Sequence, residues 1–419
     1  MRSYANWEAI SFYKEAIRVL DAQAETEMNK REKLQVCCSI IDTLMLVNYP
    51  EGSLETLQEA ERLAWELKDD RSLMAVYRRF SLYHSTKGDM ALGMEYSKKC
   101  FDAAERIGDV DAVVMIATST CMARFFAGDV LGAAAISRRA LQLIEERHGE
   151  YRSSIGRWTI HSQLSGWCGS ALAAMGEFEE ARAVLDKGLE RSFEANDTFG
   201  AGWLEFFFCT LSFSEGNENA LVNHARRAIQ CFEETGVEIT LGSAWSYLGM
   251  GYFLLGEYEA ARHCAEKGIE LQRETGVQQV SIPLCLTNLT LALMALGDHE
   301  SAIRSATEAL KLSQKSKAKL WEGLAWTVLG RSVGGADPAQ IDIAEQHLRQ
   351  GISMTEEMKL RPWSAQGCLY LGELFELTDR REEAIENLKM AETMSREMGM
   401  GYWLDRSREA LARLDVRRQ

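Results

Sequence analysis

The residues best able to do chemistry in this 419-residue chain are seven histidines, ten cysteines and several paired carboxylates. No two histidines show the H-x-x-x-H or H-E-x-x-H spacing of a metal site, and no cysteines form a C-x-x-C pair. Carboxylate pairs such as Glu179-Glu180 and Glu382-Glu383 fall on expected helices whose charged faces are solvated. The sequence therefore predicts no metal site and no acid–base pair.

Motifs for nucleotide binding and nucleophilic catalysis are also missing. The chain contains no G-x-x-x-x-G-K-[ST] loop and no G-x-S-x-G elbow. Gly249-Met250-Gly251 lacks the third glycine of a dinucleotide-binding loop and lies within an expected helix. We therefore expect no catalytic residue and no cofactor. An enzyme hidden around Arg157, Trp158 and His161 is kept as a less favoured hypothesis.

Composition narrows the class of protein. With 47 Lys+Arg and 62 Asp+Glu, the net charge of −15 disfavours binding to nucleic acid, which requires a basic surface. The N-terminus has no apolar signal core, and the longest apolar-rich stretch, 113–126, is interrupted by polar residues, so we expect no membrane association. Scattered cysteines in apolar stretches indicate a reduced, cytoplasmic setting. The chain has 4 prolines, where average usage gives about twenty, which predicts helices joined by short connections.

One sequence unit recurs along the chain. Its clearest copy, residues 245–261, reads WSYLGMGYFLLGEYEAA and contains W-x2-L-G-x2-Y, a Gly-Glu turn and a small residue five positions later. A glycine followed by Asp, Glu or Asn recurs at 88–89, 128–129, 176–177, 216–217 and 297–298. Glycine can adopt the left-handed conformation that ends a helix, and the polar residue after it suits the start of the next helix. Small residues let the two helices approach closely.

These motifs resemble the tetratricopeptide repeat over nearly the whole chain. The period is near 40 residues instead of the usual 34 or so, and such a period alone also fits HEAT or armadillo repeats. The Trp, Leu-Gly and Tyr set favours the tetratricopeptide repeat. The long period is similar to the C-terminal repeat region of bacterial adenylate/guanylate cyclase-linked ATPases and of maltose-activator-type transcription regulators. The resemblance implies an all-α fold, a right-handed α-solenoid of about nine antiparallel helix pairs.

The ends of the chain suggest a division into three parts. We expect residues 1–22 to be the second helix of an incomplete first repeat, residues 23–400 to form one solenoid, and residues 401–419 to be a C-terminal capping helix. The N-terminal part looks cut from a longer protein or docked on another one, and a native capping helix is the alternative.

In this family the first helix of each pair lines a concave groove in which ligands dock. Aromatic residues are frequent on the middle first helices, although such residues often pack between repeats instead. A charged clamp for acidic tails is disfavoured because only two candidates are cationic. Carried over by position relative to the Leu-Gly landmark, the candidate groove residues are Arg78, Phe125, Trp203, Phe206, Thr210, Phe213, Ser246, Met250, Phe253, Thr287, Arg331 and Glu373.

The resemblance implies a non-enzymatic scaffold that binds a peptide, a protein segment or a small molecule in its groove. The main hypothesis makes it the sensor region of a larger bacterial signalling protein linked to a cyclase or an ATPase. The alternative is a stand-alone intracellular receptor for a peptide pheromone, or an assembly adaptor.

Overall fold

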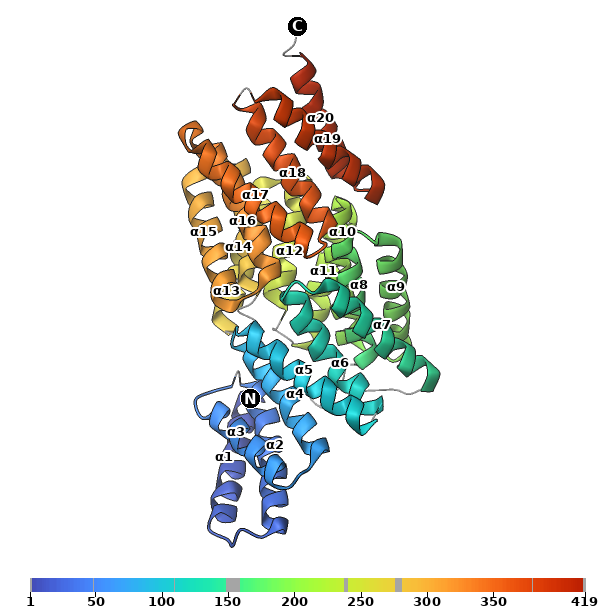
Figure 1. Ribbon diagram of the computed structural model, residues 1–419, viewed down its shortest axis with the longest axis vertical. Coiled ribbons are helices and arrows are strands. Elements are labelled where there is room, and N and C mark those ends of the chain that lie inside the picture. Colours follow the sequence, from blue (N-terminus) through green and yellow to red (C-terminus); the bar gives the residue numbers. More distant parts are fainter. Residues whose placement is uncertain are drawn as a thin grey trace.

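The computed structural model describes residues 2–47, 49–108, 110–147, 159–236, 240–275, 281–378 and 380–416. Within these ranges the regular elements are helices (Figure 1). They are α1 (Arg2–Asp21), α2 (Glu27–Leu46), α3 (Ser53–Glu66), α4 (Asp70–Thr86), α5 (Met90–Ile107), α6 (Val110–Phe126), α7 (Val130–Arg147), α8 (Ile160–Met175), α9 (Phe178–Glu194), α10 (Thr198–Glu215), α11 (Glu218–Thr235), α12 (Leu241–Leu254), α13 (Tyr258–Thr275), α14 (Ile282–Ala295), α15 (His299–Ser316), α16 (Lys319–Ala336), the short 3-10 helix η2 (Pro338–Gln340), α17 (Ile341–Glu357), α18 (Arg361–Glu376), α19 (Arg381–Met398) and α20 (Gly401–Val416).

Helices α2 to α19 pack as consecutive antiparallel pairs, α2 with α3 through α18 with α19. In the described part of the chain this gives nine pairs, preceded by α1 and followed by α20. The expected all-α solenoid is therefore confirmed. No helix in these ranges combines the length and the hydrophobicity needed to cross a bilayer.

The turns within most of the pairs follow the expected chemistry, whereas those after α16 and α18 have no left-handed glycine among the described residues. Gly128, for example, ends α6 with φ +89°, a left-handed conformation that glycine adopts without a side-chain clash. The next residue, Asp129, accepts a hydrogen bond from the backbone N–H of Gly132 at 2.9 Å, which satisfies a free donor at the start of α7. Glycines at 88, 176, 216, 256 and 297 have the same positive φ.

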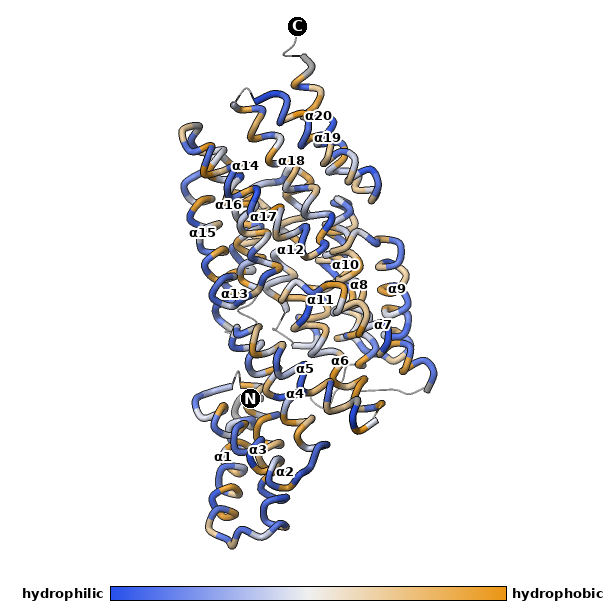
Figure 2. Tube along the Cα trace, viewed as in Figure 1, coloured by the Kyte–Doolittle hydropathy of each residue, from blue (hydrophilic) through white to orange (hydrophobic). Residues whose placement is uncertain are grey.

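In the middle repeats, charged residues are concentrated on the second helices. Figure 2 shows hydrophilic residues concentrated on α9, α13 and α15, whereas α8 and α10 are largely apolar. The first helices α8, α10, α12, α14, α16 and α18 are accordingly buried over most of their length. Polar second helices thus surround an apolar inner layer of first helices.

The solenoid closes on itself. The turns of early repeats lie against the turns of repeats further along the chain, and α6, α8 and α10 contact α16, α18 and α20. A Cβ built on Gly128 would meet the side chain of Met358, and one on Gly176 would meet Met398. Aromatic contacts complete the closure, with ring centroids 6.1 Å apart for Phe126 and Trp321. The inner face of the middle repeats is therefore a packed core with enclosed cavities.

Gly249 lies where α12 crosses α13. A Cβ at this position would be 2.8 Å from the carbonyl oxygen of Ala261 and 3.2 Å from Cβ of Cys264. We expect Gly249→Leu to overpack this crossing and lower the free energy of unfolding by about 1–3 kcal/mol, measured by urea titration. Gly401→Leu is the control, because a Cβ there meets nothing within 4 Å. Equal stability of the two variants would contradict this helix crossing.

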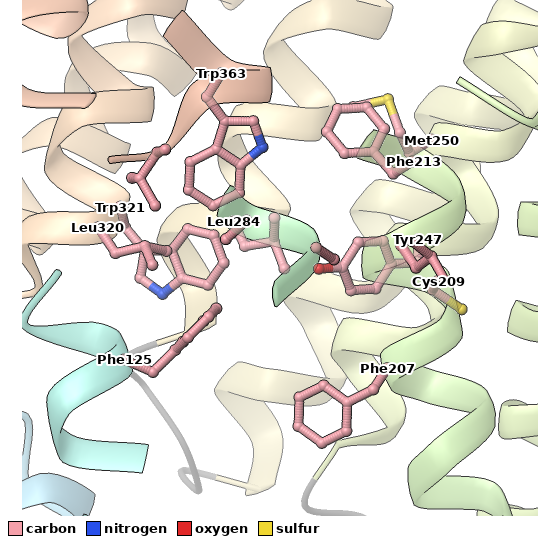
Figure 3. Packing of buried hydrophobic residues seen from close by; sticks show 14 of the residues in the cluster. Phe125, Phe207, Cys209, Phe213, Tyr247, Met250, Leu284, Leu320, Trp321 and Trp363 are labelled. Carbon is pink, nitrogen blue, oxygen red and sulfur yellow. The ribbon is translucent and has the colours of Figure 1, made fainter. Parts of the chain in front are cut away.

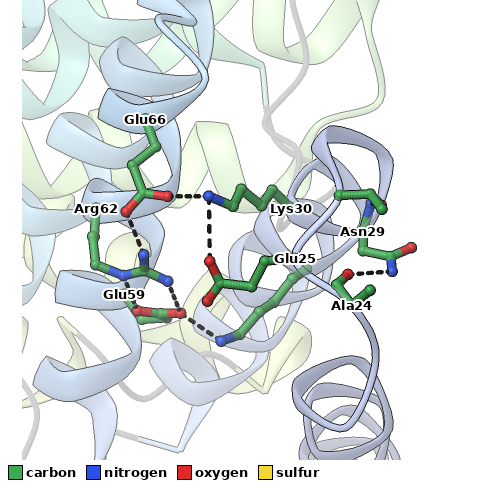
Figure 4. Close-up of polar contacts among 9 residues, drawn as sticks. Ala24, Glu25, Asn29, Lys30, Glu59, Arg62 and Glu66 are labelled. Atoms are coloured by element: carbon green, nitrogen blue, oxygen red, sulfur yellow. Dashed lines mark hydrogen bonds and ion pairs between the residues drawn. The ribbon is translucent and has the colours of Figure 1, made fainter.

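Helices α1 to α5 form a lobe with a core of its own, to which Ile116 of α6 also belongs. Ion pairs join α2 to α3 on its surface (Figure 4). Lys30 Nζ lies 2.7 Å from a Glu66 carboxylate oxygen, and Arg62 contacts both Glu66 and Glu59. Lys33 Nζ adds a contact to Glu59 at 2.5 Å. Glu59 is therefore held by two cations.

Hydrogen bonds from Arg62, and then from Lys33, lower the pKa of Glu59 from 4.5 to about 2. Because this pKa is depressed in the folded state, the stabilisation is complete above the unfolded-state pKa and is lost as the pH falls towards the folded-state value. As the pH is lowered from about 5 to about 2.5, we expect the urea concentration at the unfolding midpoint to fall less steeply for Glu59→Gln than for the unchanged protein. Glu179→Gln, at an exposed carboxylate, is the control. If Glu59→Gln had the same pH dependence of the unfolding midpoint as the unchanged protein, the lowered pKa of Glu59 would be contradicted.

Candidate binding site on the inner face

Five first helices, α10, α12, α14, α16 and α18, enclose a cavity on the inner face, here called the central cavity. Figure 3 shows Tyr247 and Met250 of α12, Leu284 of α14 and Trp363 of α18 around this region. Its volume is about 30 Å³, enough for about two water molecules. The lining residues are Thr210, Phe213, Tyr247, Met250, Leu284, Thr287, Asn288, Leu291, Leu324, Thr327, Val328, Trp363, Gln366 and Tyr370.

Three polar groups of α18 belong to residues that line this cavity, and none of the three donates a hydrogen bond to any described residue. They are the indole Nε1 of Trp363, the amide Nε2 of Gln366 and the hydroxyl of Tyr370, on side chains that are 6%, 8% and 4% exposed. Their spacing of three and four residues places them on one face of the helix. Buried donors are normally satisfied, and leaving one unpaired costs about 1–3 kcal/mol. The set is therefore suited to a ligand that supplies hydrogen-bond acceptors.

Other polar groups in the central cavity are already paired. The Thr210 and Tyr247 hydroxyls lie 3.0 Å apart, and the Asn288 amide donates to Ser246 Oγ at 2.9 Å. Burial raises the pKa of Tyr247 and of Tyr370, so both hydroxyls stay protonated at neutral pH. The Tyr370 hydroxyl therefore keeps the proton that it can donate to a ligand.

A second cavity of about 230 Å³, here called the C-terminal cavity, adjoins the first one and shares Leu291 and Tyr370 with it. Helix α20 contributes Tyr402, Trp403 and Arg406 to its wall. The guanidinium groups of Arg331 and Arg406 lie 3.3 and 2.8 Å from oxygens of the Glu373 carboxylate. Arg331 also lies over the ring of Tyr370, 3.9 Å from its centroid. Two cations with one carboxylate make this end of the site positive.

The structure brings most of the twelve groove candidates together. Two candidates contact lining residues: Ser246 accepts a hydrogen bond from Asn288, and Glu373 forms the ion pairs with Arg331 and Arg406. Six other candidates line the two cavities directly: Thr210, Phe213, Met250, Thr287, Phe253 and Arg331.

The other four candidates lie outside both cavities. Phe125 and Trp203 are buried in the core, where each packs against Trp167. Phe206 is half-buried, with its ring 5.5 Å from that of Tyr247. Arg78 lines a separate groove near the N-terminal lobe.

Sequence reasoning missed the residues that precede the Leu-Gly landmark. Tyr247, Val328 and Tyr370 each come directly before that leucine and line the central cavity. Gln366 and Trp363 continue the same stripe about one and two turns earlier than Tyr370 on α18. A helical period extended backwards from this position could have found them. No periodic signal marks Tyr402, Trp403 and Arg406, which reach the site from α20.

Titratable groups elsewhere offer no reactive centre among the described residues. His161 is buried in α8, and burial lowers its pKa to about 4, so its ring is neutral at pH 7. Arg157 and Trp158, which the hypothesis of a hidden enzyme also requires, lie outside the described residues. Burial raises the pKa of the Cys121 and Cys285 thiols to about 12. No cluster of His, Cys, Asp and Glu able to hold a metal ion occurs in the described ranges.

Residues 240–331 match the family model of the tetratricopeptide repeat. The match contains the W-x2-L-G-x2-Y pattern and spans α12 to α15 together with the first part of α16. These repeats are tetratricopeptide repeats, as their motifs indicated. No curated protein matches the sequence.

Solved structures share the fold over most of the chain. The Rap conjugation gene regulator of the plasmid pLS20, solved in complex with a Phr peptide, is 13% identical and covers 91% of this chain and 96% of its own, with a TM-score of 0.52. The apo quorum sensor NprR from B. thuringiensis is 13% identical and covers 88% and 99%, with a TM-score of 0.50. At this identity the likeness shows the α-solenoid fold.

Proposed function

We propose that this tetratricopeptide-repeat chain is a non-enzymatic scaffold that binds a short peptide in the central cavity of its inner face. The observation that carries the proposal is the row of unpaired, buried donors on α18, formed by Trp363, Gln366 and Tyr370. They span about 10 Å of helix, and an extended peptide rises about 3.3 Å per residue. The row is therefore as long as about three residues of an extended peptide, whose carbonyls on the facing side can accept these hydrogen bonds.

The adjoining C-terminal cavity suits the side chains or the charged end of the same peptide. Its walls combine aromatic rings, such as those of Tyr402 and Trp403, with the guanidinium groups of Arg331 and Arg406. Aromatic and arginine side chains contribute most to binding energy at interfaces. Of the fold neighbours, the Rap regulator is solved with a peptide and NprR is a quorum sensor, which supports a peptide ligand over a small molecule.

A peptide requires more room than the central cavity now offers, so binding must widen it. The seam between α10 and α20 is the place where this can occur, because few contacts hold it, among them the ring contact of Phe213 with Trp403 and the hydrogen bond from Trp403 Nε1 to the Phe213 carbonyl. Ligand binding would thus be coupled to a change in how the solenoid closes, which is the property required of a sensor.

Peptide binding serves both settings considered for this chain. In the first, the solenoid is the sensor region of a larger signalling protein that carries an ATPase or a cyclase. In the second, it is a peptide receptor by itself. All ten cysteines are free thiols, which supports a cytoplasmic location for either setting.

The test is a screen of pooled hexapeptides by saturation-transfer NMR, followed by calorimetry on each peptide that binds. We expect a small set of related sequences to bind with one-to-one stoichiometry. Failure of every pool at millimolar concentration, or equal binding of scrambled sequences, would contradict the proposal.

A further inference from the structure

A groove of about 730 Å³ lies between α2, α4 and α6, where the N-terminal lobe joins the rest of the solenoid (Figure 1). These are first helices, so the groove is on the inner face but apart from the central cavity. Its apolar surface comes from side chains such as Met74, Ile107, Met115 and Ile116. Here it is called the N-terminal groove.

Arginine 78 is the unusual residue of the N-terminal groove. Its neighbour Arg79 is neutralised by Asp42, with nitrogen–oxygen distances of 3.0 and 2.6 Å. Among the described residues, Arg78 has no hydrogen bond and no ion pair, although it is only partly exposed. Burial, followed by repulsion from Arg79, lowers its pKa. A charge without a partner in a partly buried position destabilises a fold. This cost indicates that Arg78 binds a negatively charged ligand.

We propose that the N-terminal groove binds a peptide carboxylate through the guanidinium of Arg78, with the apolar residues next to that carboxylate lying on the methionine-rich floor. The site is independent of the central cavity and of the function proposed for it. A guanidinium offers two parallel N–H donors that match one carboxylate. Methionine side chains adapt to apolar groups of varied shape.

The charges around Arg78 favour a single carboxylate over a phosphate dianion. Asp42 and Asp111 also line the groove and would repel a second negative charge. Arg71 and Arg79 already take part in other interactions. Among the described residues that line the groove, Arg78 is thus the cation available for one negative charge.

The test uses N-acetyl-trileucine with a free C-terminal carboxylate and the same peptide as its amide. The ε-methyl groups of Met74 and Met115 are observed by NMR in the full chain. We expect the carboxylate form to shift both methyl signals at millimolar concentration, and the amide to bind at least tenfold more weakly. Arg78→Gln should weaken binding of the carboxylate form at least tenfold, whereas Arg139→Gln, at an exposed residue of α7, should not.

Stability provides a second readout. Because Arg78 has no hydrogen bond or ion pair with any described residue, Arg78→Met should leave the melting temperature unchanged or raise it by about 1–3 °C. A loss of folding in either Arg78 variant would overturn the proposal, since it would mean that the arginine has a structural partner. Equal binding of acid and amide, no binding of either, unchanged binding by Arg78→Gln, or tighter binding of inorganic phosphate would overturn it as well.

Discussion

Replacing Trp403 by alanine is expected to lower the free energy of unfolding by about 3–5 kcal/mol, the usual cost of deleting a buried tryptophan side chain. Trp403 is 3% exposed, and its ring lies 6.0 Å from that of Phe213 and 5.0 Å from that of Tyr402. Its indole Nε1 donates to the Phe213 carbonyl at 3.5 Å, across 190 residues of sequence. The variant therefore removes the main contact that closes α20 onto α10.

Hydrogen exchange can locate this effect. Because stability in repeat proteins is a sum of local terms, we expect Trp403→Ala to speed exchange in α20 and at the C-terminal end of α10, more than in α2 and α3. Trp7→Ala is the control, since Trp7 is 48% exposed, and we expect it to change stability by less than about 0.5 kcal/mol. If the amides of α10 and α20 exchanged at the same rate in both variants, the claim that α20 closes the solenoid onto α10 would be contradicted.

Replacing Gln366 by methionine should weaken peptide binding by about 5- to 100-fold, because a buried acceptor of the peptide would lose its donor. The same change should not lower the stability of the free protein, since the Gln366 Nε2 makes no hydrogen bond to any described residue. Affinity is measured by calorimetry with a peptide identified in the screen, and stability by urea titration.

Two amides serve as controls for Gln366→Met. Asn288 lines the same cavity but is already bonded to Ser246, so Asn288→Leu should cost about 1–3 kcal/mol of stability. Gln350 is exposed on α17, so Gln350→Met should change neither quantity. Weaker stability with unchanged affinity in Gln366→Met would mean that this amide is structural.

Local features of the fold were predictable from the sequence because the same motif recurs in most of the repeats. The glycine that follows most of the first helices and the polar residue after it, such as Gly128 and Asp129, have the conformations and hydrogen bonds that their chemistry requires. Gly249 lies at the helix crossing that its place in the motif predicts. These contacts join residues that are close in sequence, so residue type and spacing suffice to specify them.

Closure of the solenoid was not predictable in this way. Contacts such as Gly128 with Met358 depend on the small rotation between successive repeats, which accumulates over five pairs. No residue type marks them. An open concave groove was therefore expected where the structure has enclosed cavities, and the contribution of α20 to the site was missed.

The central claim, that the inner face binds a peptide, is tested most directly by methionine ε-methyl NMR during peptide titration. Met250 lines the central cavity and Met294 the C-terminal cavity, whereas Met28 is 67% exposed on α2 of the N-terminal lobe. We expect a binding peptide to shift the Met250 and Met294 signals together, with one dissociation constant, while the Met28 signal stays in place. A peptide that binds but leaves Met250 and Met294 unshifted would contradict the claim.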